Sequence, residues 1–61
     1  MIRINYEKPI GGALRYIEVS GLSTDTKPDT GIVTGSIFLE IDTSDMYVYD
    51  EDTLTWVKQG G

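Results

Sequence analysis

The sequence has no cysteine and no histidine among its 61 residues, and these two absences exclude several kinds of site. Without cysteine there is no disulfide and no thiolate metal site, and without histidine the commonest zinc and copper ligand is missing. Serine and threonine also lack the usual general base that would activate them as nucleophiles. A chain this short offers little concave surface for a pair of catalytic carboxylates. We therefore expect no enzyme activity, no cofactor and no small-molecule substrate.

Basic residues and long apolar runs are also scarce. Five Lys and Arg stand against ten Asp and Glu, which gives a net charge of −5. The basic residues are scattered, and an acidic protein repels a phosphate backbone, so we expect no binding to nucleic acid. No apolar run approaches the ~18 residues of a membrane span, and the first residues lack the pattern of a signal peptide. We expect no membrane contact and a cytoplasmic site of synthesis and assembly.

The length of the chain limits the core that it can build. With 61 residues it forms at most one domain, residues 1–61. A single core of this size rarely supplies more than ~3–5 kcal/mol. Small domains usually gain further stability from disulfides, a metal or a partner chain, and only the partner chain remains here. We expect partner chains, including further copies of this chain, although a well-formed small sheet can also fold alone.

Alternating apolar and polar residues predict strands in both halves of the chain. Residues 1–19 read as a hairpin, because Pro9–Gly12 interrupts two runs with a period of two. Residues 36–58 read as a three-stranded meander, because Asp, Ser and Thr form turns between its strands. We therefore predict an all-β fold, as a small antiparallel sheet or barrel. The predicted strands are 2–7, 14–19, 36–41, 46–49 and 54–58.

Residues 20–35 form a polar connector rich in turn-forming residues. A connector of this length is unusual in so small a domain. It is either a binding loop or a strap that crosses the sheet. Leu22, Ile32 and Val33 are the apolar residues that would hold such a strap in place.

The meander has apolar residues on both of its faces, whereas a sheet with one wet face alternates cleanly between apolar and polar. Both faces are therefore expected to be covered, one by the hairpin or the strap and the other by a partner. The alternative is a small closed barrel or sandwich that the aromatic residues cap. The opposed sets are Ile37, Leu39 and Ile41 against Phe38, Tyr47 and Tyr49 against Met46 and Val48, and Trp56 against Val57.

Aromatic residues are the candidates for a protein interface. Tyr and Trp are enriched at such interfaces because one end of the side chain is apolar and the other polar. The alternative is that they are simply the largest pieces available for a small core, and this alternative is favoured for Trp56, the only tryptophan. The candidate interface residues are Tyr16, Phe38, Tyr47, Tyr49 and Trp56.

Acidic residues in the two meander turns raise the possibility of a calcium site. Calcium takes six to eight oxygen ligands, but no loop with the spacing of an EF-hand is present. The two turns also lie at opposite ends of one strand, roughly 15 Å apart at ~3.3 Å per residue. We therefore expect turn residues and no metal site. The residues are Asp42, Asp45, Asp50, Glu51 and Asp52.

The stretch from Gly21 to Val57 carries a family resemblance. It contains Gly-Leu-Ser-Thr-Asp-Thr-Lys-Pro at Gly21–Pro28, Gly-Ser-x-Phe-x-Glu-x-Asp-Thr at Gly35–Thr43, Met-Tyr-x-Tyr-Asp at Met46–Asp50 and Thr-Trp-Val at Thr55–Val57. This run resembles a short β-module that recurs in the structural proteins of tailed bacteriophages. The resemblance implies a virion or virion-assembly component, which is capsid-associated, head–tail or tail/fibre in type. It implies other phage structural proteins as partners and adds no catalytic residue.

The net charge supports a second hypothesis from a different class. A small acidic protein can dock on a host enzyme and imitate nucleic acid by its charge. The chain would then be a phage-encoded inhibitor or regulator of a host protein. Dedicated inhibitors of this kind carry denser charge than this sequence, in which several acids occupy turns.

Overall fold

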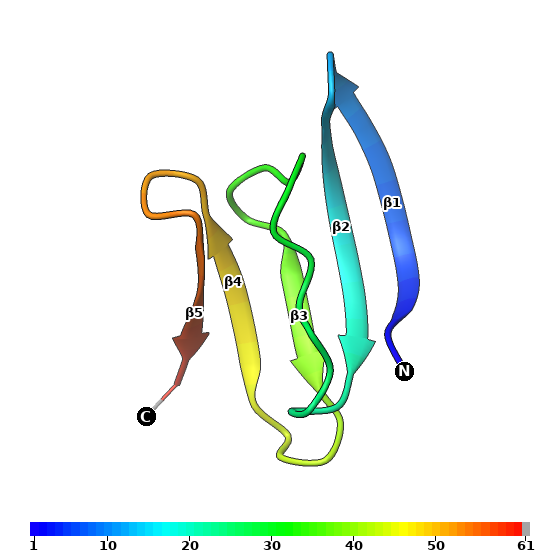
Figure 1. Ribbon diagram of the computed structural model, residues 1–61, viewed down its shortest axis with the longest axis vertical. Helices are drawn as coiled ribbons and strands as arrows, with labels where there is room; N and C mark the ends of the chain where they lie inside the picture. The colour runs from blue at the N-terminus through cyan, green and yellow to red at the C-terminus, as the bar shows by residue number, and fades with distance from the viewer. Residues whose placement is uncertain (61) are drawn as a thin grey trace.

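The computed structural model describes residues 1–60, which contain five strands and no helix (Figure 1). This confirms the predicted all-β fold with an N-terminal hairpin and three C-terminal strands. In the described part of the chain, nothing helical is long and apolar enough to cross a membrane. The strands are β1 (Arg3–Gly11), β2 (Leu14–Gly21), β3 (Ile37–Glu40), β4 (Met46–Asp50) and β5 (Thr55–Gln59).

The strands form a single open sheet in the order β1-β2-β3-β4-β5. The hairpin β1–β2 and the meander β3–β5 are antiparallel, whereas β2 and β3 run parallel to each other. This pair departs from the antiparallel arrangement that the sequence predicts, and the sheet does not close into a barrel. Parallel neighbours need a crossover of about a dozen residues or more, and the connector between β2 and β3 is long enough to provide it.

The first strand continues through Pro9, where the sequence predicts a turn. Proline removes a donor from the ladder, but a strand at the edge of a sheet has only one neighbour and tolerates this loss. The reversal comes later, at Gly12, whose φ of 58° lies in the left-handed region. The register also shifts between Ile4 and Tyr6. The hairpin is therefore longer than predicted, and its tip projects beyond the other strands (Figure 1).

Residues 22–36, which we call the strap, cross one face of the sheet. In Figure 1 the strap lies in front of β2 and β3. Its second half pairs with the backbone of β2: Arg15 N–H donates to the Gly31 carbonyl at 2.9 Å, and Val33 N–H donates to the Arg15 carbonyl at 3.0 Å. Of the two alternatives for the connector, the structure therefore shows the strap.

The core lies between the strap and the sheet. Ile32 comes from the strap, and the other buried apolar residues come from β2, β3 and β4. The polar group of Ser36 is satisfied within this core, since its Oγ accepts the N–H of Ile17 at 3.1 Å. Among residues 1–60, every buried side-chain nitrogen and oxygen has a hydrogen-bond partner. The core residues are Ile17, Val19, Ile32, Phe38 and Tyr49, with Ile2, Tyr47 and Trp56 packed against them.

Candidate protein-interaction surface

The register of the sheet divides its side chains between two faces. Residues that pair across neighbouring strands point to the same face. Val19 pairs with Phe38, Phe38 with Tyr47, and Tyr49 with Trp56, so these side chains share the face beneath the strap, which we call the strap face. The opposite side, which the strap does not cross, we call the open face.

Lys27 holds the middle of the strap to the strap face. Its Nζ donates to Glu40 Oε2 at 2.7 Å and lies 4.8 Å from the centroid of the Phe38 ring and 4.6 Å from that of the Tyr47 ring. A cation over an aromatic face is attracted by the ring quadrupole. One side chain therefore joins the strap to both β3 and β4.

Glu40 is a nearly buried acid whose charge is compensated on both oxygens. Lys27 binds Oε2, and the Thr43 hydroxyl donates to Oε1 at 2.8 Å. The Lys27 ammonium, followed by the Thr43 hydroxyl, holds the pKa of Glu40 below its ordinary value of 4.5. Glu40 is therefore ionised at neutral pH and serves the strap as an anchor.

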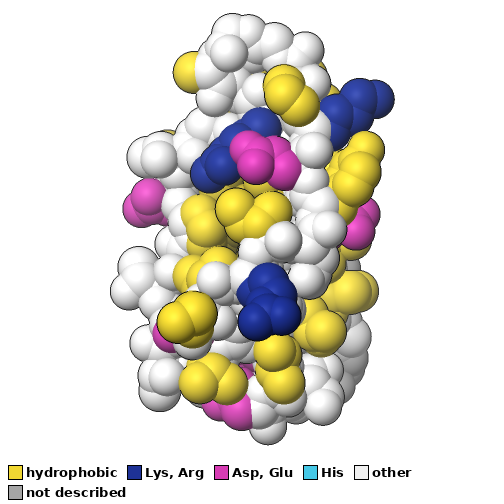
Figure 2. Space-filling model, turned by 90° about the vertical axis from the view of Figure 1, so that its right-hand side faces the viewer, with side chains coloured by type: hydrophobic (Ala, Val, Ile, Leu, Met, Phe, Trp, Pro, Cys, Tyr) yellow, Lys and Arg dark blue, Asp and Glu magenta, His cyan; other side chains and the backbone are white. Residues whose placement is uncertain are grey.

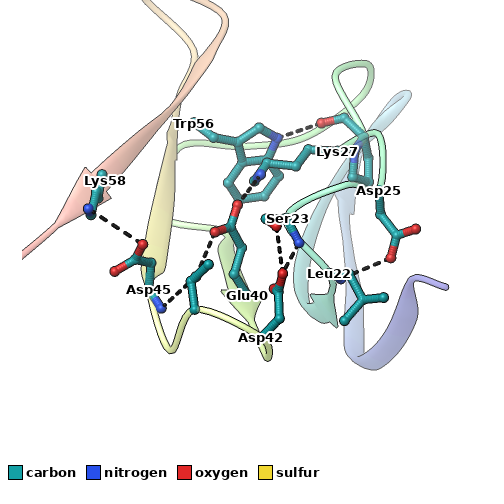
Figure 3. A network of polar contacts seen from close by, with 11 residues as sticks. Leu22, Ser23, Asp25, Lys27, Glu40, Asp42, Asp45, Trp56 and Lys58 are labelled. Carbon is teal, nitrogen blue, oxygen red and sulfur yellow. Dashed lines mark hydrogen bonds and ion pairs between the residues drawn. The ribbon is translucent and has the colours of Figure 1, made fainter.

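Two further carboxylates fasten the first turn of the strap (Figure 3). Asp42 accepts the N–H of Ser23 at 2.9 Å and its hydroxyl at 2.6 Å, and these two bonds, the hydroxyl first, lower the pKa of Asp42. Asp25 accepts the Met1 ammonium at 2.8 Å and the N–H of Leu22 at 2.9 Å. The Met1 ammonium is the main reason why the pKa of Asp25 lies below its ordinary value.

Aromatic side chains bind the centre of the strap through its carbonyl groups. Trp56 Nε1 donates to the Pro28 carbonyl at 2.6 Å, and the Tyr49 hydroxyl donates to the Asp29 carbonyl at 3.3 Å. The two rings also contact each other edge to face, with centroids 5.1 Å apart. The polar ends of these residues are therefore satisfied within the chain.

The five candidate interface residues thus lie on different sides of the molecule. Phe38 and Tyr49 are buried in the core, and Tyr47 and Trp56 are half-buried beside it. All four lie on the strap face, where the strap occupies the position of an external partner. Only Tyr16 lies on the open face, since it pairs with Lys8 and its neighbour Ile17 points into the core.

The open face carries two apolar rows that cross the C-terminal strands. Ile37, Val48 and Val57 pair across β3, β4 and β5 in the first row. Leu39 and Met46 pair in the second row. Leu39, Met46 and Val57 are 43%, 42% and 44% exposed. In the sequence, the alternation along the meander placed these residues on the faces opposite their aromatic neighbours. The aromatic residues were nevertheless chosen as the interface candidates.

Polar and aromatic residues flank these rows on the hairpin side of the open face. The rings of Tyr6 and Tyr16 meet edge to face with centroids 6.1 Å apart. The Tyr16 hydroxyl donates to Glu18 Oε2 at 2.7 Å, and this bond is the main reason why the pKa of Tyr16 is raised. Figure 2, viewed toward the β1 edge, shows hydrophobic side chains along this edge of the sheet, with Lys, Arg, Asp and Glu side chains between them.

The acidic turns have structural partners of their own. Asp50 accepts the N–H of Asp52 at 3.0 Å, Glu51 accepts the N–H of Thr34 at 3.1 Å, and Asp45 forms an ion pair with Lys58 at 3.4 Å. Within residues 1–60, no group of three or more acids is placed to hold a metal ion, and no pocket is found.

Comparison of the chain with protein-family models, curated proteins and solved structures gives no match. The function of the chain is therefore inferred from its own residues.

Proposed function

We propose that this chain is a non-enzymatic structural module that acts through protein–protein contact, and that the open face is its contact surface. The observation that carries the proposal is the difference between the two faces of one thin sheet. The chain covers the strap face with its own residues and leaves Leu39, Met46 and Val57 between 42% and 44% exposed on the other. Contiguous apolar surface on a small protein typically marks an interaction site.

The resemblance of residues 21–57 to a module of tailed-bacteriophage structural proteins supports a place in a virion or in virion assembly. A particle presents many copies of its components close together, which suits a module with a small core and a flat apolar face. The proposed partners are other phage structural proteins and further copies of the chain. Localisation in the virion, after assembly in the host cytoplasm, follows from the same proposal.

The test is the presence of the chain in particles. Particles of a phage that encodes the chain are purified by density gradient, and their proteins are quantified by mass spectrometry. The proposal expects a fixed number of copies per particle for the wild-type chain and a strong reduction for Val57→Lys, which places a charge on the open face. Absence of the wild-type chain from both particles and assembly intermediates would exclude the proposal.

The alternative of an acidic inhibitor of a host protein has less support from the charges. Asp25, Glu40 and Asp42 are already bound to the strap and the N-terminus, so they are not free to imitate phosphates. A chain that is absent from particles and binds one host enzyme with strong salt dependence would favour this alternative.

A further inference from the structure

We infer that the open face is covered by the same face of a second copy of the chain, in a two-fold dimer. This inference deepens the proposed function, on which it rests, by naming the partner of the open face. Three properties of the face support it: its charge, the arrangement of that charge, and its size.

The open face is electrically neutral although the chain is strongly acidic. By register, Arg3 and Lys8 of β1 and Glu18 and Asp50 point to this face, so its formal charge is 2 − 2 = 0. The other three basic and eight acidic residues of the chain lie elsewhere, so the rest of the molecule carries the whole net charge of −5. Two copies would repel each other through any other broad surface, whereas the open faces can meet without opposing net charge.

The charges on this face are also arranged for a two-fold axis parallel to the strands. Lys8 pairs with Tyr16 on β2, and Asp50 lies two residues beyond Val48 on β4. Val48 and Glu18 both pair with Ile37, so these three residues lie at the same level of the sheet. Asp50, two residues further along the antiparallel strand β4, therefore lies at the level of Tyr16 and Lys8. An axis along the strands and near β3 exchanges the two sides of the sheet, so Lys8 on β1 of one copy lies over β5 of the other, one strand away from Asp50 on β4.

The apolar rows lie near the middle of this arrangement. Ile37 and Leu39 are on β3, the central strand of the sheet, and Met46 and Val48 are on its neighbour β4. A two-fold axis near these strands packs the rows of one copy against those of the other. Two sheets that pack face to face in this way form a sandwich, with strand directions about 30° apart.

The size of the face suits such a contact. The molecule extends 33 × 22 × 16 Å, and the sheet lies across the two longer dimensions (Figure 1), whose bounding rectangle of about 730 Å² is an upper limit for the flat outline of the face. A stable interface of standard size buries about 800 Å² on each partner. Side chains add accessible area to the flat outline, so an interface that uses most of this face can supply one half of a standard interface.

Light scattering coupled to size-exclusion chromatography tests the inference on the full 61-residue chain over a concentration series. The chain mass is 6.8 kDa, so the expected dimer has twice that mass. Met46→Lys and Val57→Lys, which put a charge on the open face, should each raise the dissociation constant at least tenfold. Leu54→Lys is the matched control, because Leu54 is 67% exposed in the β4–β5 turn outside the rows and the charge change is the same. It should leave the dissociation constant unchanged.

The fold of each variant is checked by the near-ultraviolet signal of Trp56, which lies on the strap face and reports the strap independently of the open face. A wild-type chain that stays monomeric at several hundred micromolar overturns the inference, as does a trimer or hexamer, or a dimer that both open-face variants leave intact. A monomeric chain that is nevertheless found in particles removes the dimer and keeps the proposed function, with another protein on the open face. A chain that forms the dimer but is absent from particles removes the proposed function and keeps the dimer.

Discussion

Both faces of the sheet carry apolar side chains, but the chain covers only one of the two faces with its own residues. On the strap face, Phe38 and Tyr49 are buried, because a segment of the same chain lies over them and its Asp29 carbonyl accepts the Tyr49 hydroxyl. On the open face, Leu39 follows Phe38 directly in β3 and Val57 follows Trp56 directly in β5, and both remain almost half exposed. The difference shows that amino-acid type alone does not set burial in a single-layer sheet, since the covering segment decides which face becomes the core.

The largest effect is expected from substitutions that compare the two faces at adjacent residues of β3. Phe38→Ala removes a ring that is 0% exposed, at an expected cost of about 3–5 kcal/mol. That is close to the whole stability of a core of this size, so the variant should be largely unfolded. Leu39→Ala should cost no more than about 1 kcal/mol in the monomer, since its side chain is 43% exposed.

Urea denaturation followed by Trp56 fluorescence measures both variants, at a concentration low enough to keep the chain monomeric. Equal losses for Phe38→Ala and Leu39→Ala would mean that the two faces contribute equally to the core, and the distinction between a strap face and an open face would then have no energetic basis.

A smaller effect is expected where the strap passes the hairpin. Gly31 has a φ of 69°, and a Cβ built on it would lie 2.8 Å from the backbone carbonyl oxygen of Ala13. Gly31→Ala should therefore cost about 2–3 kcal/mol, from the left-handed backbone and from the contact together. Gly12→Ala is the matched control, because Gly12 has a φ of 58° and open space around it, and it should cost only about 1–2 kcal/mol. Identical losses in thermal unfolding would show that the contact with Ala13 has no energetic role.

Acid should loosen the attachment of the strap to the sheet. The pKa values of Asp25, Glu40 and Asp42 are lowered in the folded chain, so the unfolded chain binds their protons more tightly. Their stabilisation is complete above the ordinary values of 3.8 and 4.5, and it is lost as the pH falls through the lower folded values. Stability should therefore decline below about pH 4.5.

The Trp56 near-ultraviolet signal, followed as a function of pH in moderate urea, measures this decline. Glu40→Gln should be less stable at neutral pH, because Lys27 loses its charged partner, and its acid decline should be shallower. A variant with the wild-type acid dependence would show that Glu40 does not contribute to it.

The smallest predicted effect lies in the β4–β5 turn, which belongs to neither face. Leu54 has a φ of 54°, an unfavourable conformation for a residue with a branched side chain. Leu54→Asn should raise the stability by about 0.5–1 kcal/mol, since asparagine tolerates the left-handed region better. A lower melting temperature for this variant would mean that the Leu54 side chain makes a contact that outweighs its backbone strain.

Local sequence patterns predicted the strands well and their long-range arrangement less well. Alternation with a period of two located all five strands to within a few residues, because side-chain direction in a strand is a local property. The extension of β1 through Pro9 was missed, since proline is excluded from central strands but tolerated at an edge, and the position of a strand in its sheet is a tertiary property.

The candidate surface was predicted only in part for a similar reason. The alternation placed Leu39 and Phe38 on opposite faces, but it contained no information on which face the strap would cross. The aromatic residues were therefore the more prominent interface candidates. The ion pair of Lys27 with Glu40 joins residues 13 positions apart, and no local pattern indicates such a partnership.

The parallel pairing of β2 and β3 has a consequence for the time course of folding. The hairpin β1–β2 and the meander β3–β5 each form through local contacts, but a sheet of two or three short strands is marginal alone. They unite only when residues 22–36 close a loop that brings β3 alongside β2, and this step loses chain entropy before it gains contacts. We expect the docking of the two halves to limit the folding rate. Shortening the loop would not accelerate folding, because the residues that span the distance are also those that enclose Phe38.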